Sequence, residues 1–206
     1  MGTRTFWSEP TGRSWRWLRR YATSSDRATG QWACASGYHS AKVRIEDVDG
    51  EVVSGDSWPH DDPRWPASCE LGCGYRFADS DVWQLFGWHE YSGGGQTFTL
   101  CHGEVPVGAM YDASWMPDLW KGSDGICLVV MCPQREGDYA MEWMVDSRAS
   151  NCTLPQDKVH KCWVRHGDPR TERVTVDKNG VTCVAGAGSI QIGDWHGFLR
   201  DGELVT

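Results

Sequence analysis

The sequence predicts a mainly β protein with short helices (α+β), in which a zinc-ribbon-like N-terminal part precedes an antiparallel β part. Short runs of alternating hydrophobic residues recur between turns rich in Gly and Asp, as in antiparallel sheets. The segment W-P-A-S-C-E-L-G-C-G-Y-R-F, Trp65 to Phe77, has the form of a zinc knuckle. The chain also contains 13 Trp and 24 Gly, which favours aromatic anchors and much chain outside helices.

Length and charge limit the organisation and the partners. With 206 residues the chain can form one substantial domain or two small ones. We expect a basic helical arm at 1–30, a zinc-ribbon-like part at 31–122 and an antiparallel β part at 123–206, with one continuous domain as the alternative. The formal net charge of −8 argues against nucleic-acid binding by the molecule as a whole, because phosphate contacts need an excess of Lys and Arg.

Residues Ser14 to Ala22, S-W-R-W-L-R-R-Y-A, are the best helix candidate. Ser14 can serve as the N-cap, and Trp17, Leu18 and Tyr21 recur at helical spacing. The segment from Thr23 to Gly30 is rich in Ser, Thr, Gly and Asp and ends this predicted helix.

The same region carries a local excess of positive charge. Between Met1 and Arg27 there are six arginines and two acidic residues. We interpret Arg16, Arg19 and Arg20 either as a solvated face or as the contact to an acidic protein or to nucleic acid.

The central motif of the N-terminal part is the pair Cys69 and Cys73. Two thiols on one side of a tight turn can bind a tetrahedral Zn²⁺, and a glycine after the second ligand, Gly74, lets the chain leave without a Cβ clash. Cys34 and His39 form an earlier pair, so we expect one zinc site closed by Cys34, His39, Cys69 and Cys73. His60 is the runner-up fourth ligand. The alternative is that these cysteines are small buried hydrophobic residues.

A hairpin and a short helix are expected around these ligands. The alternating hydrophobic residues Val43, Ile45 and Val48 predict a first strand, Asp49-Gly50 a turn, and Val52 and Val53 a second strand. A ligand pair, a hairpin and a second ligand pair, in this order, are the plan of a zinc ribbon. Asp79 or Ser80 can cap a helix that runs to Phe86. A turn at Gly93 to Gly95 and a strand at Gln96 to Leu100 follow.

The C-terminal part is predicted to be antiparallel β. The Trp- and Met-rich loop from Gly108 to Gly125 is either a partner-binding patch or core, and we favour core contact. The predicted strands, with hairpin turns at Asp177 to Gly180 and Arg200 to Gly202, are Ile126 to Met131, Tyr139 to Val145, Arg173 to Val176, Val181 to Val184, Gly193 to Leu199 and Glu203 to Val205.

A second group of potential ligands occurs in this part. A second zinc could be bound by Cys132, Cys152, Cys162 and one of two histidines, His166 or His160. Their spacing matches no compact knuckle, so unliganded thiols around a β core are the favoured interpretation.

Catalytic motifs are weak, which favours a non-enzymatic protein. His89-Glu90 lacks the second histidine of a metalloprotease helix, and the sequence has no Walker loop, nucleophile elbow or dinucleotide fingerprint. A metal-dependent hydrolase is the third hypothesis for the chain. It requires a metal with three protein ligands and water at the fourth position.

Nine cysteines in a sequence without an apolar leader-like run suggest a reducing compartment, where clustered cysteines more often bind metal than form disulfides. The longest apolar stretch, Ile126 to Cys132, is too short to span a bilayer, so we expect no membrane partner.

Three runs carry a family resemblance: H-D-D-P-R-W-P-A-S-C-E-L-G-C-G-Y-R-F, H-K-C-W-V-R-H-G-D-P and A-G-A-G-S-I-Q-I-G-D-W-H-G-F-L-R-D-G-E-L. With these runs the chain resembles small proteins encoded by bacteriophages of actinobacteria. The resemblance implies a phage origin, the host cytoplasm or the virion as location, a β-rich metal-binding body and no transferable catalytic residue.

We therefore expect a zinc-binding, non-enzymatic phage protein that acts by protein–protein binding, as a structural or virion-associated component. The alternative is a phage effector that binds a host protein or nucleic acid through the arginine-rich arm. Trp195-His196-Gly197 is either a functional site or a hairpin segment that buries Trp195 and Phe198.

Overall fold

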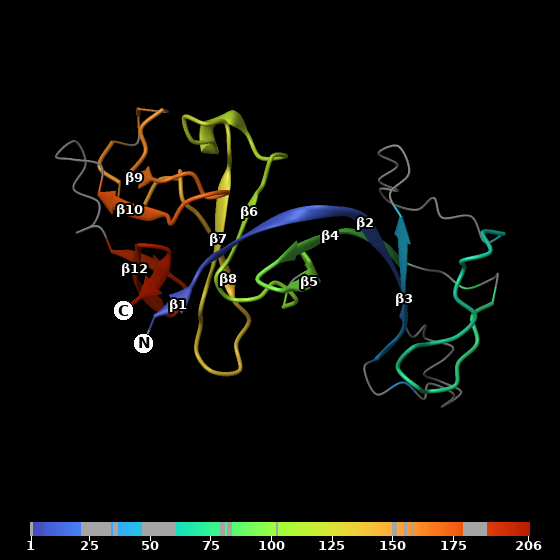
Figure 1. Cartoon of the computed structure of the whole chain (residues 1–206). Coiled ribbons are helices and arrows are strands. Elements are labelled where there is room, and N and C mark those ends of the chain that lie inside the picture. The colour runs from blue at the N-terminus through green and yellow to red at the C-terminus, as the bar shows by residue number, and fades with distance from the viewer. Residues whose placement is uncertain are drawn as a thin grey trace. The chain divides into compact units, whose positions relative to one another are not determined.

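The computed structural model of the chain confirms the mainly β class (Figure 1). Among the residues it describes, the one helical segment is a short 3-10 helix, η1 (Asp118–Trp120). None of their helices has the length and apolarity needed to cross a membrane. The structure describes residues 2–21, 34, 37–46, 61–78, 81, 84–101, 103–149, 152–154, 156–157, 159–178 and 189–206.

The chain divides into two compact units. Unit 1 comprises Met1–Glu9 and Tyr91–Thr206, and unit 2 comprises Pro10–Glu90. The boundary expected near residue 122 lies inside unit 1, because the segment around it joins two paired strands, β6 (Ala109–Asp112) and β7 (Leu128–Cys132). The expected N-terminal arm is also divided, since β1 pairs with the last strand of unit 1 through Thr3↔Leu204.

Unit 1 is built from antiparallel pairs and one parallel pair. The parallel pair joins the start of β2 to β6 through Phe6↔Ala109. The order β1-β13-β12-β11 forms one sheet, β9 pairs with β10, and β6, β7 and β8 are consecutive neighbours in another sheet. The remaining strands with residues in this unit are β1 (Thr3–Arg4), β2 (Phe6–Tyr21), β4 (Gln84–Gly93), β5 (Gln96–Thr99), β8 (Met141–Met144), β9 (Trp163–His166), β10 (Thr175–Lys178), β11 (Ile190–Ile192), β12 (Trp195–Arg200) and β13 (Glu203–Val205).

The hairpin turn predicted at Arg200 to Gly202 and the turn predicted at Gly93 to Gly95 are confirmed, whereas Asp177 and Lys178 of the third predicted turn belong to strand β10. Asp201 and Gly202 connect β12 to β13 with φ of 47° and 74°, and two positive φ values are what a two-residue type I′ turn requires. Gly94 and Gly95 connect β4 to β5 with φ of 59° and 80°. The strands expected near 96–100, 126–131 and 139–145 are present as β5, β7 and β8.

The helix predicted at Ser14 to Ala22 is wrong, because these residues up to Tyr21 belong to strand β2. Burial alternates along this strand: Ser14, Arg16 and Leu18 are buried, and the residues between them are only half-buried. The strand pairs antiparallel with β3 (Tyr38–Glu46) from Arg13↔Glu46 to Tyr21↔Tyr38. Pairing over this length therefore overrides a helical pattern that rested on three hydrophobic residues.

The short helix predicted to end at Phe86 is wrong over its last part, since β4 begins at Gln84. Its two proposed caps, Asp79 and Ser80, lie outside the described residues. For the hairpin predicted at Val43 to Val53, the first part is in β3, which pairs with β2, and the second part lies outside the described residues.

The expected partner of the Arg173 to Val176 strand, Val181 to Val184, also lies outside the described residues. Within the described chain, β10 pairs instead with β9, in the register Thr175↔His166 to Lys178↔Trp163. The predicted strand therefore exists two residues later than expected, and its observed partner precedes it in the sequence.

Unit 1 has a well-formed hydrophobic core. One cluster gathers buried residues of β7, β8 and the C-terminal strands, among them Leu128, Trp143, Leu199 and Leu204. A second cluster covers the other face of β6 and β7, with Tyr111 and Val129. Alternation along β7 sends successive side chains into the two clusters, which explains why all five of its residues are buried.

Unit 2 differs, because its described residues form no cluster of buried hydrophobic side chains. The buried hydrophobic residues found there are Leu18, Ala41, Cys34 and Cys69. Only Leu18 among them is a large apolar side chain. Within the part of unit 2 that the structure describes, apolar burial is therefore a small source of stability.

Polar and cationic contacts supply part of that stability. The carboxylate of Glu90 is 2% exposed and accepts hydrogen bonds from Trp15 Nε1 at 3.0 Å and Thr11 Oγ1 at 3.1 Å. Arg44 Nε lies 3.4 Å from the same carboxylate. Lys42 Nζ lies 4.4 Å from the ring centroid of Trp17, within range of a cation–π contact. Aromatic and charged residues therefore replace part of an apolar core in this unit.

Candidate metal centre

The structure brings together all four residues predicted to bind zinc in the N-terminal part. The ligand atoms of Cys34, His39, Cys69 and Cys73 all lie within 4.8 Å of one another. Three of these residues are buried, and Cys73 is half-buried. All four belong to unit 2.

The first ligand pair is positioned by a turn that leads into a strand. Gly37 donates its backbone N–H to the Cys34 carbonyl at 3.1 Å and has a φ of 76°, which favours glycine. His39 follows at the start of β3, where pairing with Arg20 of β2 fixes its backbone. The C-x4-H spacing therefore spans a closed turn and the first residues of a strand.

The second ligand pair lies on a tight knuckle. The Cys69 N–H donates to the Tyr75 carbonyl at 2.9 Å, and Ser68 and Arg76 form an isolated antiparallel bridge. Gly72 and Gly74 have φ of 74° and 78°, so the chain reverses on both sides of Cys73 at positions where a Cβ would be strained. This local geometry is what the sequence C-E-L-G-C-G-Y predicted.

Strand β3 and the knuckle are linked next to the ligands. The Glu70 N–H donates to the Ser40 carbonyl at 2.8 Å, and Ser40 Oγ donates to Glu70 Oε1 at 2.8 Å. The Ser40 N–H also points at Cys69 Sγ, 3.4 Å away. A backbone N–H directed at sulfur stabilises a thiolate, which is the form that binds zinc.

The distances fit a tetrahedral metal. Zinc–sulfur bonds of about 2.3 Å and zinc–nitrogen bonds of about 2.0 Å place the ligand atoms of one site roughly 3.5 to 3.8 Å apart. Cys73 Sγ lies 3.2 Å from His39 Nδ1, and the full set falls within 4.8 Å. Three sulfurs and one imidazole form a Cys₃His set, which is typical of structural zinc sites.

The pKa of the Cys73 thiol is lowered from its ordinary value. Burial raises this pKa, but hydrogen bonds from the Tyr75 backbone and from the thiols of Cys69 and Cys34 together outweigh burial. The protein environment therefore makes this thiol more acidic than an ordinary cysteine.

Aromatic and charged residues hold the imidazole in place. The Tyr75 ring stacks on His39, with centroids 3.9 Å apart and planes at 9°. The Tyr75 hydroxyl hydrogen-bonds to both oxygens of Asp81 at 2.8 and 2.9 Å. Arg20 Nε donates to Asp81 Oδ1 at 2.7 Å, and its guanidinium lies 5.2 Å from the Tyr75 ring centroid. Residues beyond the ligands thus fix the orientation of His39.

We predict that Tyr75→Phe lowers zinc affinity about tenfold, because the ring keeps its stack on His39 but loses its bonds to Asp81. Tyr75→Ala removes the stack as well, and we expect a larger loss, of up to about 100-fold. Competition with a chromophoric zinc chelator measures both affinities. Equal affinities for the two variants and the unmodified protein would show that the aromatic ring plays no part in holding the ligand.

The remaining residues predicted to bind metal are not brought together as expected, or lie outside the described residues. His60 lies outside the described residues. In unit 1, the proposed set of Cys132, Cys152, Cys162 and His166 is not brought together. Cys132 is fully buried in β7 among core residues, and burial raises the pKa of its thiol to about 12. His166 Nε2 lies 3.2 Å from Asp177 on the adjacent strand.

The group that the structure forms in unit 1 is Cys152, His160 and Cys162, whose ligand atoms lie within 4.8 Å of one another. Two of the predicted cysteines are therefore correct members of this group, and the histidine is His160 instead of His166. The sequence signal was the spacing C-x7-H-x-C in one connection, which is more compact than a set that includes Cys132 and His166.

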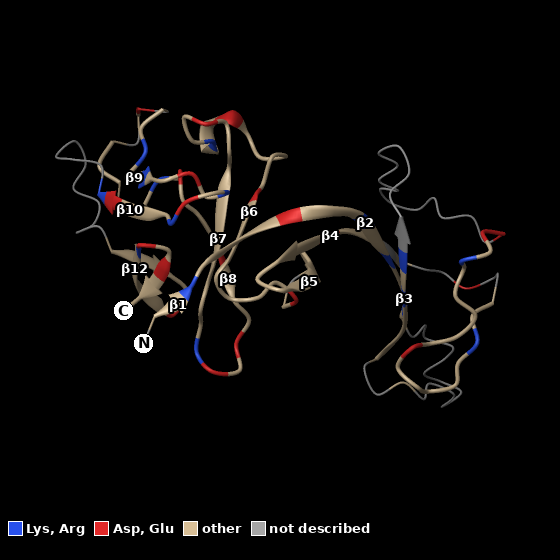
Figure 2. Ribbon diagram, in the orientation of Figure 1, with Lys and Arg blue, Asp and Glu red and all other residues tan. Residues whose placement is uncertain are grey.

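The three arginines proposed as a partner-binding arm are engaged within unit 2. Arg16 is 1% exposed and donates to Ser14 Oγ at 3.0 Å. Arg19 lies over the rings of Trp17 and Tyr38, at 5.1 and 4.9 Å from their centroids, and Arg20 is paired with Asp81. In Figure 2, basic and acidic residues are interspersed along the described ribbon of unit 1. The interpretation of these residues as an open nucleic-acid contact is wrong for Arg16, which is buried.

Residues weighed for catalysis have structural roles. Glu90 of the His89-Glu90 pair is buried and bound to Trp15 and Thr11. In the Trp195-His196-Gly197 run, Trp195 packs into the core of unit 1, as the hairpin interpretation predicts, whereas Phe198 is only half-buried. Gly197 is required there, because a Cβ would lie 2.2 Å from the Val205 carbonyl oxygen.

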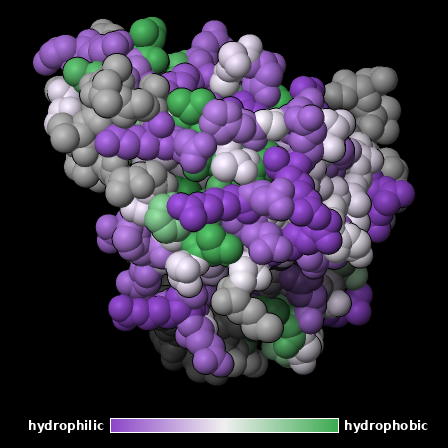
Figure 3. Space-filling model, turned by 60° about the vertical axis from the view of Figure 1, so that its left-hand side comes forward, coloured by the Kyte–Doolittle hydropathy of each residue, from purple (hydrophilic) through white to green (hydrophobic). Residues whose placement is uncertain are grey.

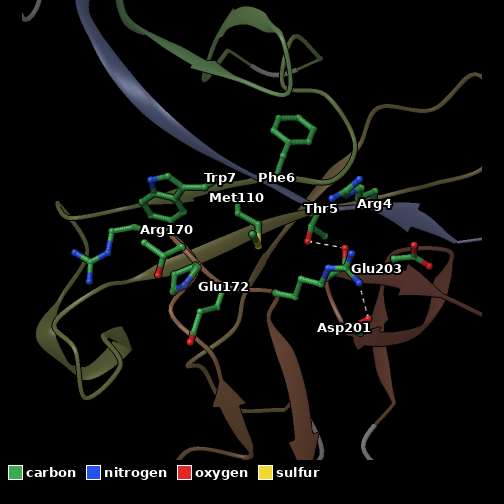
Figure 4. Close-up of a pocket in the computed structure, with 13 residues that line it drawn as sticks. Arg4, Thr5, Phe6, Trp7, Met110, Arg170, Glu172, Asp201 and Glu203 are labelled. Carbon is green, nitrogen blue, oxygen red and sulfur yellow. Dashed lines mark hydrogen bonds and ion pairs between the residues drawn. The ribbon is translucent and has the colours of Figure 1, made fainter.

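Unit 1 also contains a cavity of about 310 Å³ between the start of the chain and the loop before β10 (Figure 4). Charged residues of both signs line it, and Arg173 is paired with Asp201 at 2.8 Å. Its lining, within the described residues, contains no cysteine or histidine. This cavity therefore lacks the thiolate and imidazole ligands that zinc prefers.

Comparison with models of protein families, with curated proteins and with solved structures finds no match for this chain. The chemistry of its clustered side chains is therefore the basis for any functional assignment.

Proposed function

We propose that this chain is a zinc-binding, non-enzymatic protein that acts by binding another protein, as a structural component of a bacteriophage particle. The observation that carries the zinc-binding part is the closed set of Cys34, His39, Cys69 and Cys73. Four protein ligands complete a tetrahedral shell, so no position is left for water or substrate. Zinc in such a site stabilises the fold and does not catalyse a reaction.

The low apolar content of unit 2 supports a structural role for the metal. Leu18 is its one large, fully buried apolar residue among those described. A zinc ion that joins the turn at Cys34, strand β3 and the knuckle at Cys69 would cross-link three segments whose described residues form no hydrophobic cluster. Small domains without a sufficient core commonly rely on metals in this way.

An exposed hydrophobic segment in unit 1 supports binding to a protein partner. The loop between β6 and β7 is divided: Met116 and Trp120 pack against the core, while Trp115 is 60% exposed and Leu119 is 45% exposed. The expectation of core contact therefore holds for part of this loop only. The face of the molecule seen in Figure 3 is mainly hydrophilic, and its hydrophobic residues form small separate groups. An exposed Trp beside an exposed Leu is suited to an interface anchor.

Placement in a phage particle rests on the sequence resemblance. It predicts that purified particles of the phage that encodes the chain contain it at a fixed copy number. Mass spectrometry of gradient-purified particles measures this number, with particles from a strain that lacks the gene as the control. Presence of the chain in infected cells but not in particles would contradict the structural role and favour the effector hypothesis.

We expect Trp115→Ser with Leu119→Ser to reduce incorporation into particles at least tenfold, since removing an interface anchor costs about 2 kcal/mol or more. Zinc content and thermal stability should stay unchanged, because both side chains are exposed. Tyr139→Ser is the matched control, as Tyr139 is 59% exposed in unit 1. Equal loss of incorporation in the control would show that this loop is not the specific contact.

A further inference from the structure

We infer that unit 1 binds a second zinc ion through Cys152, His160 and Cys162, and that the fourth coordination position is taken by a water molecule or a small anion from solution. This inference goes beyond the proposed function, which rests on the zinc site of unit 2. The three ligand atoms lie within 4.8 Å of one another, the same limit that contains the four ligands of unit 2. Two thiols with one imidazole strongly favour zinc over harder cations.

The histidine has an unused nitrogen. His160 Nε2 is shielded from solvent and has no hydrogen-bond partner among the described residues. A buried polar atom without a partner is costly and rare, and a metal next to two cysteines would remove that cost. This observation is independent of the distances between the ligand atoms.

One of the thiols is prepared for metal binding in the same way as in unit 2. The Leu154 N–H points at Cys152 Sγ, 3.4 Å away, as the Ser40 N–H points at Cys69 Sγ at the same distance. Such N–H groups stabilise the negative charge of a thiolate. The two sites therefore share a feature that an ordinary buried cysteine, such as Cys132, does not need.

The backbone around the three residues is held in place by hydrogen bonds. The connection between β8 and β9 contains no regular helix or strand in its described residues. Arg148 braces it by donating to the carbonyls of His160 at 3.1 Å and Leu154 at 3.4 Å. The Cys152 N–H donates to the Ala149 carbonyl at 3.1 Å. These hydrogen bonds hold the segments that carry the three candidate ligands in place.

The hydrophobic surroundings are too small to explain this arrangement. Cys162 is the one buried residue of its cluster, and its apolar neighbours Ala149, Leu154 and Trp163 are only partly buried. A connection of this length without its own core usually needs a cross-link to stay ordered. A metal that joins Cys152, in the middle of the connection, to His160 and Cys162 at its end would provide it.

The open position follows from the number of ligands and from access to solvent. The group contains three candidate ligands within the described part of the chain. His160 lines two cavities, of about 430 and 780 Å³, and both also reach Asp146. Both cavities border the His160 side chain, which is the route by which water or a small anion would reach the group. A zinc ion with three protein ligands and one exchangeable ligand is the arrangement that binds anions.

The test uses the full-length protein purified under reducing conditions. Elemental analysis should find two zinc ions per chain, and His160→Gln or Cys162→Ser should each lower this number to one. Cys132→Ala is the matched control, because Cys132 is a buried cysteine of the same unit outside the group, and it should retain both ions. A single zinc ion in the unmodified protein that persists in His160→Gln would overturn the inference.

The open position is tested with cobalt in place of zinc and azide as the probe. Azide should shift the visible d–d bands of the cobalt protein, and the shift should disappear in His160→Gln but persist in Cys73→Ser. Persistence in Cys73→Ser separates this site from the unit 2 site, so each can fail without the other. If azide does not shift these bands, the inference of an open coordination position is wrong. Loss of the second metal in Cys183→Ser would do the same, by identifying a fourth protein ligand.

Discussion

We expect that replacing Cys73 with serine abolishes zinc binding at the site proposed in unit 2 and unfolds most of residues 10–90. A neutral serine hydroxyl is a poor zinc ligand, and the described contacts between the ligand segments are a few hydrogen bonds and one ring stack. Structural zinc contributes about 10 to 16 kcal/mol of apparent binding free energy in small zinc domains, whereas whole domains are stable by only about 5 to 15 kcal/mol. The loss therefore exceeds what the contacts around Glu90 and Trp17 can offset.

Limited proteolysis followed by mass spectrometry measures this effect. In the Cys73→Ser protein we expect rapid cleavage within β3 and within residues 61–78, while the strands of unit 1 remain protected. Cys101→Ser is the control, because Cys101 is a buried cysteine that belongs to neither metal-binding group. A Cys73→Ser protein that resists cleavage like the unmodified protein would show that unit 2 is stable without the metal.

The second large effect is expected in unit 1, where hydrophobic burial replaces metal as the main source of stability. Leu199 is fully buried in the cluster that includes Leu128, Trp143 and Leu204. Leu199→Ala should lower the free energy of unfolding of this unit by about 2 to 5 kcal/mol, since it removes apolar contact and leaves a cavity. Urea denaturation followed by tryptophan fluorescence measures the change.

Zinc content provides the complementary readout for Leu199→Ala. We expect the unit 2 site to keep its zinc in this variant, because none of its four ligands belongs to unit 1. Glu203→Ala is the matched control on the neighbouring strand, where Glu203 is exposed and pairs with Arg200 across the hairpin. A stability loss in the control as large as in Leu199→Ala would mean that the core cluster is not the cause.

Local chemistry explains which parts of the fold could be predicted from sequence. The Asp201-Gly202 turn and the Gly94-Gly95 turn were recognisable because few residue pairs tolerate two positive φ values. Strand β7 was recognisable as a continuous apolar run that is buried on both faces. The β2 segment was misread, because alternating Trp and Arg residues also place three hydrophobic residues at helical spacing, and only pairing with β3 decides between the two.

The candidate sites show the same difference between features encoded by neighbouring residues and features decided by strand pairing. Cys69 and Cys73 were found because the knuckle is encoded by their own spacing and by the glycines beside them. Choosing between His166 and His160 was not possible, since the choice depends on which residues β9 pairs with: His166 lies within the strand and pairs with Thr175, while His160 precedes it. The buried role of Arg16 was also invisible, because a single strand does not reveal which of its faces is covered.

The most direct test of a metal-organised unit 2 is amide hydrogen exchange of the full chain, before and after zinc is removed with a chelator and then restored. Zinc should protect the amides of β3 and of residues 61–78, its removal should abolish that protection, and its return should restore it, with unit 1 strands such as β7 and β12 protected throughout. Protection in unit 2 that is the same with and without zinc would contradict the account.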